Sequence, residues 1–411
     1  MSNPAVPKGV DDHSWLAAIA HKQEEAAELL RRPEEEQQKL GYFHTLREIL
    51  QQPATWLVTS RHLASISGEL LPAVDGAATL VLTGSGSSEY AGECVRLPLQ
   101  NSLKIPAQTI GGGVLLTHGG RAIAPSRPGL MVSLARSGDS PESVEAVSIA
   151  LETEPDFRHL VITCNAQGRL ATTYRGDSRV KVVVLAEQTN DRSLVMTSSF
   201  TNMVLAASFL GSLNAPGPYI ALVEGLAQKA AELLTTHFDA LAGVARRDFN
   251  RAVFLASGPR LGAARESALK MVEMTAGRVS AMSETYLGLR HGLMSAVHSD
   301  TLIVCFLSSQ PLVRAYECDL IRELNEKQLG IAKVIFGESI PSDLAQNGDV
   351  TIDLSGLAAL GDDNMPVLDV IPGQLLGLFR SMKEGLQPDS PSIDGVINRV
   401  VQEFKLHRAT E

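Results

Sequence analysis

The chain has 411 residues, enough for two domains of ordinary size, and a formal net charge of −10. The acidic balance argues against nucleic acid and anionic membranes as partners, because binding to either depends on clustered Lys and Arg. The cysteines, Cys94, Cys164, Cys305 and Cys318, are too far apart for a zinc motif or a disulfide framework. No segment approaches the roughly 18 to 20 apolar residues that cross a bilayer, so we expect a soluble cytoplasmic protein.

The N-terminal part of the chain has a helical pattern. Residues 14–67 place apolar side chains at spacings of three and four, with a break at Arg32 and Pro33. We therefore predict a helical segment over residues 1–68, and we expect its charged run at 33–38 to be a solvated face or a turn.

The next segment, ATLVLTGSGSSEYAGE, joins an apolar run at Thr79 to Leu82 to a loop rich in glycine and serine. A helix is expected to follow from about Tyr90. The glycines allow the backbone to approach a ligand closely, and the serines offer hydroxyl groups. A third glycine and a suitably spaced acidic residue are missing, which argues against a dinucleotide site.

The segment LMVSLARSGDSPESVEAVSIAL has the same order: an apolar run, a hydroxyl-rich loop and a helix expected to begin at Pro141. The start of a helix has unpaired N–H groups and a partial positive charge, so Ser137, Gly138 and Ser140 there could surround a phosphate. The alternative is an ordinary helix cap formed by Ser140 or Asp139. The sequence leaves both interpretations open.

Further apolar runs alternate with helical patterns, which predicts parallel sheets with helices on both faces. AVFLASGPRLGAARESALKMVE and TLIVCFLSSQPLVRAYE repeat the order of the two serine-rich segments, which indicates an internal duplication. The second copy has Ser309, Gln310 and Pro311 in place of the serine and glycine cluster. We therefore expect residues 69–225 to bind an anion and residues 226–385 to supply reactive groups.

Two glutamates in the second half lie on one face of a predicted helix. Glu266 and Glu273 are seven residues apart, or roughly 10 Å along the helix axis, too far to share a proton. Lys270 lies four residues after the first and three before the second, which is the spacing of stabilising ion pairs. From these residues alone, an exposed salt-bridged face is the favoured interpretation.

Several motifs follow one another along the chain: LTGSGSSEYAGE, SGDSPESVEAV, LVMTSSFTNM, ESALKMVEMTAG, SETYLGLRHG and DGVINRVVQ. On these motifs the chain resembles the sugar isomerase (SIS) domain family over nearly its whole length. Within that family it resembles the AgaS-type galactosamine-6-phosphate deaminase/isomerases, also named tagatose-6-phosphate ketose/aldose isomerases. The resemblance implies an α/β fold of two SIS domains, each a flavodoxin-like αβα sandwich around a parallel sheet, and a C-terminal tail over residues 386–411 that closes the active site. It implies no metal and no organic cofactor.

The resemblance also implies substrate-binding residues. Phosphate-binding positions of a related enzyme, the isomerase half of glucosamine-6-phosphate synthase, fall on Ser88, Ser137 and Ser140, and Ser87 adjoins the first of them. Ala135 stands where the relative has a serine, and Arg136 would compensate for the missing hydroxyl if it faced the phosphate. The other substrate contacts that we expect are Gly86, Thr197, Ser198 and Arg399, with Lys405 as a second available cation in the tail.

Three residues have catalytic roles by resemblance. Glu273 is the base that moves a proton between carbons 2 and 1, Glu266 positions groups beside it, and His291 opens the sugar ring. In the related enzyme this histidine reaches the active site of the other subunit. The resemblance therefore implies a homodimer or a larger oligomer with shared active sites. Leu293 departs from the proline that is usual after this histidine.

The implied activity converts galactosamine 6-phosphate to tagatose 6-phosphate with release of ammonia. One alternative is a ketose/aldose isomerase of a hexose 6-phosphate that does not deaminate. Another is a non-catalytic sugar-phosphate sensor, although a transcriptional sensor needs a basic helix-turn-helix that the acidic N-terminal helices do not offer. The reverse amination is disfavoured because no glutaminase-like segment is expected in this sequence.

Overall fold

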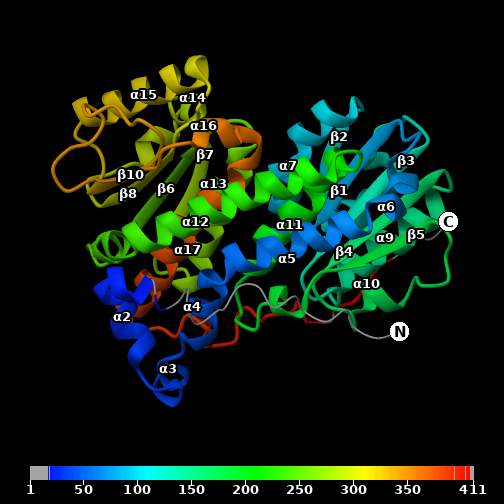
Figure 1. The fold of residues 1–411 in the computed structure, drawn as a ribbon, viewed down its shortest axis with the longest axis horizontal. Helices are drawn as coiled ribbons and strands as arrows, with labels where there is room; N and C mark the ends of the chain where they lie inside the picture. Colours follow the sequence, from blue (N-terminus) through cyan, green and yellow to red (C-terminus); the bar gives the residue numbers. More distant parts are fainter. Residues whose placement is uncertain (1–16, 18, 393, 403, 408–411) are drawn as a thin grey trace.

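The computed structural model describes residue 17 and residues 19–392, 394–402 and 404–407. In this part of the chain, two five-stranded parallel sheets lie side by side with helices around them (Figure 1). This arrangement confirms the predicted α/β fold with two sheets. None of the helices in the described ranges has the length and apolar content needed to cross a membrane.

The first sheet has the strand order β2-β1-β3-β4-β5. Its strands β1 and β3 are buried along their full length, as expected for central strands covered on both faces. The strands are β1 (Thr79–Gly84), β2 (Ala107–Gly111), β3 (Gly129–Ala135), β4 (Phe157–Thr163) and β5 (Val180–Val184). The helices that follow them are α7 (Ser87–Leu103), α8 (Gly112–His118), α9 (Pro141–Thr153), α10 (Arg169–Thr172) and α11 (Ser198–Ser208).

The second sheet has the order β10-β9-β8-β6-β7, which is the same order when its strands are counted from β6. This identity of topology supports the internal duplication. Its strands are β6 (Arg251–Ala256), β7 (Ser280–Thr285), β8 (Thr301–Phe306), β9 (Ala332–Gly337) and β10 (Val350–Asp353). Its helices are α12 (Pro216–Ala245), α13 (Arg260–Met274), α14 (Tyr286–Leu289), α15 (Pro311–Glu326), α16 (Leu357–Leu360) and α17 (Pro366–Lys383). The predicted boundary at residue 225 lies within α12.

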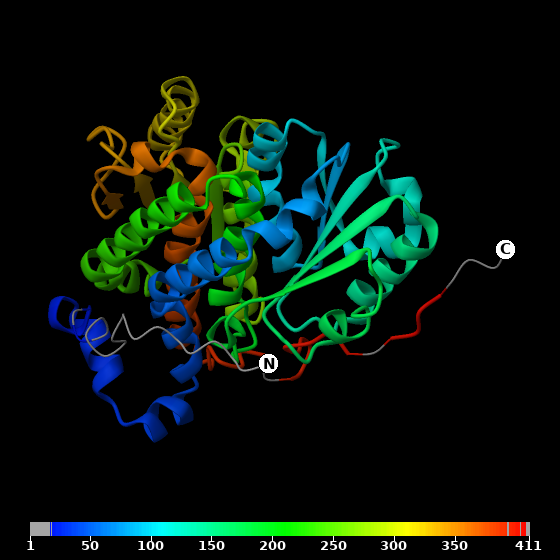
Figure 2. The ribbon, with the colours of Figure 1, turned by 45° about the vertical axis from the view of Figure 1, so that its right-hand side comes forward.

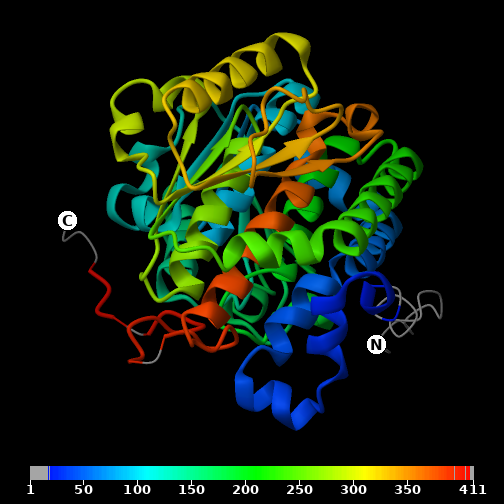
Figure 3. The ribbon, with the colours of Figure 1, turned by 90° about the vertical axis from the view of Figure 1, so that its left-hand side faces the viewer.

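The N-terminal segment is helical, as predicted, in the residues that the structure describes. It comprises α2 (Glu24–Arg31), α3 (Glu34–Leu40), α4 (Phe43–Leu50), α5 (Gln52–Ser65) and α6 (Ser67–Val74), with the predicted break at Arg32 and Pro33. Residues 1–16 and 18 of the predicted segment lie outside the described ranges. Figure 3 shows the N-terminal helices, in blue, beside the beginning of the C-terminal segment, in red, which α4 contacts.

Helix α7 begins at Ser87, so the start predicted near Tyr90 was wrong. The glycine before it explains the earlier start: Gly86 has φ 57° and ψ −125°, a conformation that L side chains avoid, and it takes the N-cap position. Ser87 and Ser88 therefore belong to the first turn of the helix. Helix α9 begins at Pro141, as predicted.

The two halves meet through helices α7 and α13, which pack against each other. The approach is close at Gly262, where a Cβ atom would lie 2.7 Å from Sγ and 2.8 Å from N of Cys94. A glycine at this position therefore brings the helix after β6 against the helix after β1. This packing places the residues of α13 beside the serines of α7.

His159 on β4 gives the first testable prediction. Its ring is buried, and neither ring nitrogen has a hydrogen-bond partner among the described residues. Burial, with a smaller effect of Arg179, lowers the pKa of the imidazole from 6.5 to about 4. The unfolded chain then takes up a proton more readily than the folded one, so stability is complete above pH 6.5 and falls as the pH drops towards 4.

We expect His159 to account for a loss of about 2 kcal/mol in the free energy of unfolding between pH 7 and pH 5. The variant His159→Phe removes the titrating group and should lack this loss. Urea unfolding of both proteins at the two pH values measures the difference. The same pH dependence in both proteins would contradict the prediction.

Candidate active site

A cavity of about 580 Å³ lies beyond the carboxyl ends of β1 and β3. In the first sheet, β1 lies between β2 and β3, so the strand order reverses direction at β1. A parallel sheet has a crevice beyond the carboxyl ends of its strands at such a point. The loops after both strands contribute to the cavity wall, together with one residue of α13, residues 194 and 196, and the C-terminal segment. Figure 2 shows this segment running along the first half of the molecule.

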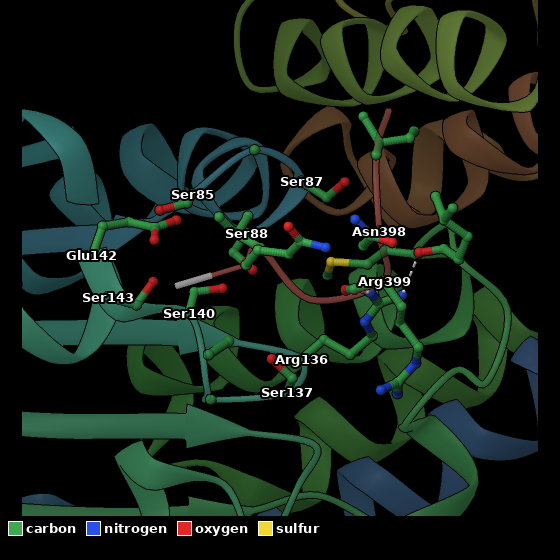
Figure 4. Close-up of a pocket in the computed structure, with 18 of the residues that line it drawn as sticks. Ser85, Ser87, Ser88, Arg136, Ser137, Ser140, Glu142, Ser143, Asn398 and Arg399 are labelled. Carbon is green, nitrogen blue, oxygen red and sulfur yellow. Dashed lines mark hydrogen bonds between the residues drawn. The ribbon is translucent and has the colours of Figure 1, made fainter. Parts of the chain in front are cut away.

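The serines of the two loops face the cavity from different sides (Figure 4). Those after β1 precede or begin α7, and those after β3 precede α9 or lie in its first turn. No side chain of the described residues caps the N-terminus of either helix. Two helix N-termini therefore face one cavity. The N–H groups of Ser88, Glu89 and Ser143 donate to backbone carbonyl oxygens, but the partial charges of the helices and the hydroxyls at their starts suit an anion. The lining serines are Ser85, Ser87, Ser88, Ser137, Ser140 and Ser143.

The structure decides against the ordinary cap that the sequence left open at α9. Ser140 occupies the N-cap position, but its hydroxyl forms no capping hydrogen bond. The Asp139 carboxylate instead accepts a hydrogen bond from the backbone N–H of Arg169 at 2.9 Å. The hydroxyl of Ser137 accepts one from the N–H of Asp139 at 3.3 Å. The hydroxyl of Ser140 is therefore available to a ligand.

Arg136 lines the cavity, but the ends of its guanidinium group bind the protein itself. Nη1 donates to the carbonyl oxygens of Ser193, Leu194 and Val195 at 3.3, 2.9 and 3.1 Å. Nη2 donates to the carbonyl oxygen of Arg399 at 2.5 Å. The sequence expectation that Arg136 replaces the missing hydroxyl at the phosphate therefore has no support from these contacts, which instead fix the loop after β3.

Helix α13 brings Glu266, Lys270 and Glu273 together below the serines of α7. The Lys270 ammonium lies 3.3 Å from Oε1 of Glu266, pairs closely with Oε2 of Glu273, and donates to the hydroxyl of Ser87 at 3.1 Å. Glu273 lines the cavity, whereas Glu266 lies below it and is fully buried. The ion pairs expected from the spacing are present, but they are buried at the site and do not form an exposed face.

Burial acts in opposite directions on the pKa values of Glu266 and Lys270, the two fully buried groups of this cluster. Burial raises the pKa of Glu266 to about 7, although the Lys270 charge acts against the rise. Burial alone would lower the pKa of Lys270, but the charges of Glu266 and Glu273 outweigh it and raise that pKa. Lys270 therefore stays protonated and holds two carboxylates close to the cavity.

His291 is not at the cavity of its own chain. It is exposed and lies just after α14, on the second half of the molecule, where its backbone N–H donates to the carbonyl oxygen of Gly288 at 2.9 Å. The exposed apolar side chains of Leu287 and Leu293 lie on either side of it in the sequence. The position leaves the imidazole accessible to another molecule.

The structure does not bring Thr197 and Ser198 to the cavity, so their expected substrate contacts have no support. Both are fully buried where α11 begins. The Asp191 carboxylate accepts from the N–H of Thr197 at 2.8 Å, and the Ser198 hydroxyl lies 3.4 Å from that of Thr55. Asn202 donates to the Ser198 carbonyl oxygen at 2.8 Å. These polar groups join helices α5 and α11 in the core.

The C-terminal segment forms one wall of the cavity. Among the described residues of this segment, Arg399 is the only charged one that lines the cavity. The Arg399 guanidinium donates to the Asp191 carbonyl oxygen and, at 2.7 Å, to Oδ1 of Asn190. Lys405 does not line the cavity. The tail residues that do are Gly395, Val396, Ile397, Asn398, Arg399, Val401, Gln402 and Phe404.

Several lining residues were missed by the sequence interpretation. Leu194 and Met196 come from the segment before α11, and Glu142 faces the cavity close to Ser85 (Figure 4). No spacing pattern marks Leu194 or Met196, whereas Glu142 stands in the first turn of a helix whose start was correctly predicted. Lys270 was noticed only as an ion-pair partner. In the described residues, no group of His, Cys, Asp or Glu side chains is arranged to hold a metal ion.

In the second half, the serines after β8, at the position that corresponds to the loop after β3, bind a carboxylate of the protein itself. Asp362 accepts from the N–H and hydroxyl of Ser309 at 2.9 and 2.8 Å, and from the hydroxyl of Ser308. Beside it, the buried Arg260 forms two hydrogen bonds to Asp369 at 2.8 and 2.6 Å. The hydrogen bonds that an anion would use in this half are therefore made internally.

Comparison with known proteins gives the family. No family model matches the chain. AgaS of Streptomyces coelicolor is 38% identical over 373 residues, which cover 89% of this chain and 95% of the relative. The D-galactosamine-6-phosphate deaminase AgaS of Shewanella sp. is 32% identical over 88% of this chain and 91% of its own. A solved Clostridium novyi protein, classed with the tagatose-6-phosphate ketose/aldose isomerases, has a TM-score of 0.86 at 29% identity and covers 93% of this chain and 99% of its own. The chain therefore belongs to the AgaS family of D-galactosamine-6-phosphate deaminases, which have the SIS fold.

Proposed function

We propose that the protein converts galactosamine 6-phosphate to tagatose 6-phosphate and releases ammonia. The observation that carries the proposal is the cavity itself, in which two uncapped helix N-termini and a carboxylate from the other half line the same space. A sugar phosphate requires both features: a site for the anion and a base beside carbons 1 and 2. The relationship to AgaS deaminases supports the choice of substrate.

In this proposal the phosphate lies between the first turn of α7 and the loop before α9. Its oxygens accept hydrogen bonds from the hydroxyls of Ser88, Ser137 and Ser140 and from backbone N–H groups of both helices, with Ser87 and Gly86 alongside. Both arginines at the cavity are bound to backbone carbonyls, so the helix N-termini provide most of the attraction. Fixing the phosphate orients a small flexible substrate for the reaction.

Glu273 then acts on the open-chain sugar. Its carboxylate takes the proton from carbon 2 and returns it to carbon 1, which changes the aldehyde with a 2-amino group into a ketose imine. Water adds to the imine carbon and ammonia leaves, which yields the ketose. Lys270 keeps the carboxylate of Glu273 in place, and Glu266 below it holds the ammonium of Lys270 from the other side.

Ser140→Ala should weaken the binding of phosphorylated sugars alone. The Ser140 hydroxyl makes no helix-capping bond, so its removal leaves the protein stable while deleting one charge-assisted hydrogen bond. Such a bond is worth about 1.5–3 kcal/mol, which corresponds to about a 10- to 150-fold loss of affinity. Calorimetric titration with galactosamine 6-phosphate and with galactosamine measures this. An equal loss for both sugars would reject the phosphate site.

His291 completes the site from a second copy of the chain in this proposal, because it is exposed and away from the cavity of its own chain. Mixed dimers test this. A dimer of one Glu273→Gln chain and one His291→Asn chain has one site with both groups intact. After exchange of subunits, an equal mixture should regain roughly a quarter of wild-type turnover, as expected for a two-fold symmetric dimer. No recovery despite verified exchange would place His291 outside the site.

An assay of ammonia release from galactosamine 6-phosphate, run beside isomerisation of tagatose 6-phosphate, tests the proposed function. We expect ammonia and ketose in equal amounts. Ketose formation from unaminated aldose phosphates without any release of ammonia would favour the isomerase alternative, which the classification of the Clostridium novyi structure keeps open. A cytoplasmic location is part of the proposal, and it is supported by the free, buried state of the four cysteines.

A further inference from the structure

We propose that Glu48, on helix α4 outside the cavity, is a positioning residue that holds residues 190–196 in the shape required by the phosphate loop and the C-terminal tail. The inference rests on the proposed function, because it assigns the N-terminal helices a part in forming that same site. Glu48 does not line the cavity, so the proposed role involves no contact between Glu48 and the substrate. A continuous series of hydrogen bonds runs from α4 to two arginines at the cavity.

The first contacts in this series are made by the Glu48 carboxylate. Oε1 accepts from the backbone N–H groups of Arg192 and Ser193 at 2.5 and 3.2 Å, and Oε2 accepts from the hydroxyl of Ser193. The side chain is 6% exposed. Burial and the nearby Asp191 charge raise its pKa to about 8, so this acid is kept in the interior at an energetic cost. All three hydrogen bonds go to residues 192 and 193.

Asp191 fixes the same segment from within. One of its carboxylate oxygens accepts from the N–H groups of Thr197 and Ser199, both at 2.8 Å, and from the Ser199 hydroxyl at 2.5 Å. These contacts tie the segment to the beginning of α11. With Glu48 on one side and Asp191 on the other, the backbone between residues 191 and 199 has little freedom to rotate.

The carbonyl oxygens of this segment are then turned towards the cavity arginines. Arg136 binds those of residues 193, 194 and 195, and Arg399 binds that of Asp191 at 2.8 and 2.5 Å. Arg136 is itself the residue between β3 and Ser137, and it also binds the carbonyl oxygen of Arg399. One segment thus anchors both the loop that carries the proposed phosphate serines and the tail that covers them.

Helix α4 also holds the start of the tail. The Asp389 carboxylate accepts from the N–H groups of His44 and Thr45 at 3.1 and 2.7 Å and from the Thr45 hydroxyl at 2.7 Å. The Asp389 carbonyl oxygen accepts from the N–H of Leu194 at 2.9 Å, and Leu194 lines the cavity. A single helix therefore contacts the tail at its base and the segment to which Arg399 binds further along.

The test compares Glu48→Ala with Glu48→Gln and with Asp239→Ala. Asp239 is the matched control, because its carboxylate also accepts two backbone N–H groups of an N-terminal helix, those of Glu24 and Glu25, but makes no contact with residues 190–196. Glutamine keeps an oxygen for the two N–H groups and offers an amide N–H to Ser193, so it should restore the site. Ser193→Ala is the milder variant if Glu48→Ala does not fold.

We expect Glu48→Ala to raise KM for galactosamine 6-phosphate at least tenfold while kcat changes less, because the tethering of the phosphate is impaired and the base is not. Glu48→Gln and Asp239→Ala should both stay close to wild type. Ser193→Ala should raise KM in the same direction by a smaller factor. A KM in Glu48→Ala no higher than in Asp239→Ala, or no recovery in Glu48→Gln, would overturn the inference.

Limited proteolysis gives a second readout that needs no sugar. Trypsin cleaves after Arg399 only when that side chain leaves the Asp191 carbonyl oxygen, so Glu48→Ala should be cut there at least five times faster than wild type. Cleavage after the exposed Arg121 is the internal reference. Equal rates after Arg399 would overturn the inference. If the wild type acts on no sugar phosphate, the proposed function fails, and this rate still decides the role of Glu48.

Discussion

Glu273→Gln is expected to lower kcat by about 10²- to 10⁴-fold, the usual contribution of a general base. Glutamine has nearly the same shape, and its amide oxygen still accepts from Lys270, so the cluster on α13 keeps its arrangement. The amide takes up no proton from carbon 2. Affinity for galactosamine 6-phosphate should change little, because the proposed phosphate contacts lie on α7 and before α9.

Ammonia release and calorimetric binding, measured on the same preparation, separate these two effects. Glu326→Gln is the matched control, since Glu326 is an exposed glutamate at the end of α15 and does not line the cavity. It should behave as wild type. Turnover of Glu273→Gln within a few fold of wild type would make Glu273 a structural residue and remove the base from the proposed mechanism.

Lys270→Met is expected to lower the free energy of unfolding by about 3–5 kcal/mol, as is usual when one partner of a buried ion pair is removed. Lys270 and Glu266 are both fully buried, so Glu266 would lose its compensating charge and become protonated. Turnover should fall as well, because the Glu273 carboxylate and the Ser87 hydroxyl both lose the ammonium that holds them.

The pH dependence of this variant has a definite sign. The pKa of Glu266 is already raised to about 7, so the folded state binds a proton more readily than the unfolded state, and stability falls as the pH rises above 4.5. Without Lys270 the pKa rises further. The loss of stability in Lys270→Met should therefore be larger at pH 8 than at pH 5.

Lys327→Met provides the control for this prediction. Lys327 also pairs with a glutamate four residues away on a helix, at 2.6 Å from Glu323, but its side chain is 51% exposed. Such surface pairs contribute about 0–1 kcal/mol. Urea unfolding at both pH values compares the variants. Equal small losses in Lys270→Met and Lys327→Met would show that the cluster on α13 does not behave as a buried ion pair.

The central strands and the serine loops were predictable because both are local features. The strands β1, β3, β4, β6, β8 and β9 are apolar runs, and the start of α9 is marked by Pro141. The outer strands β2, β7 and β10 were not predicted. Their sequences, AQTIG, SAMSET and VTID, are short and partly polar, since edge strands are covered less completely.

The site was predictable only where a motif and a helix start coincide. Thr197 and Ser198 also stand at the start of a helix, but Asp191 caps that helix from within the same segment, a contact that no spacing reveals. Arg136 was expected at the phosphate, yet it binds carbonyl oxygens of residues 57 to 59 positions further along. Such contacts depend on how distant segments of the first half come together in three dimensions, which local patterns do not encode.

The decisive measurement is a crystal structure of Glu273→Gln with galactosamine 6-phosphate. We expect the phosphorus atom between the hydroxyls of Ser88, Ser137 and Ser140, and carbons 1 and 2 of the sugar beside the amide of residue 273. Phosphate bound elsewhere, or a sugar whose carbons 1 and 2 point away from α13, would contradict this expectation.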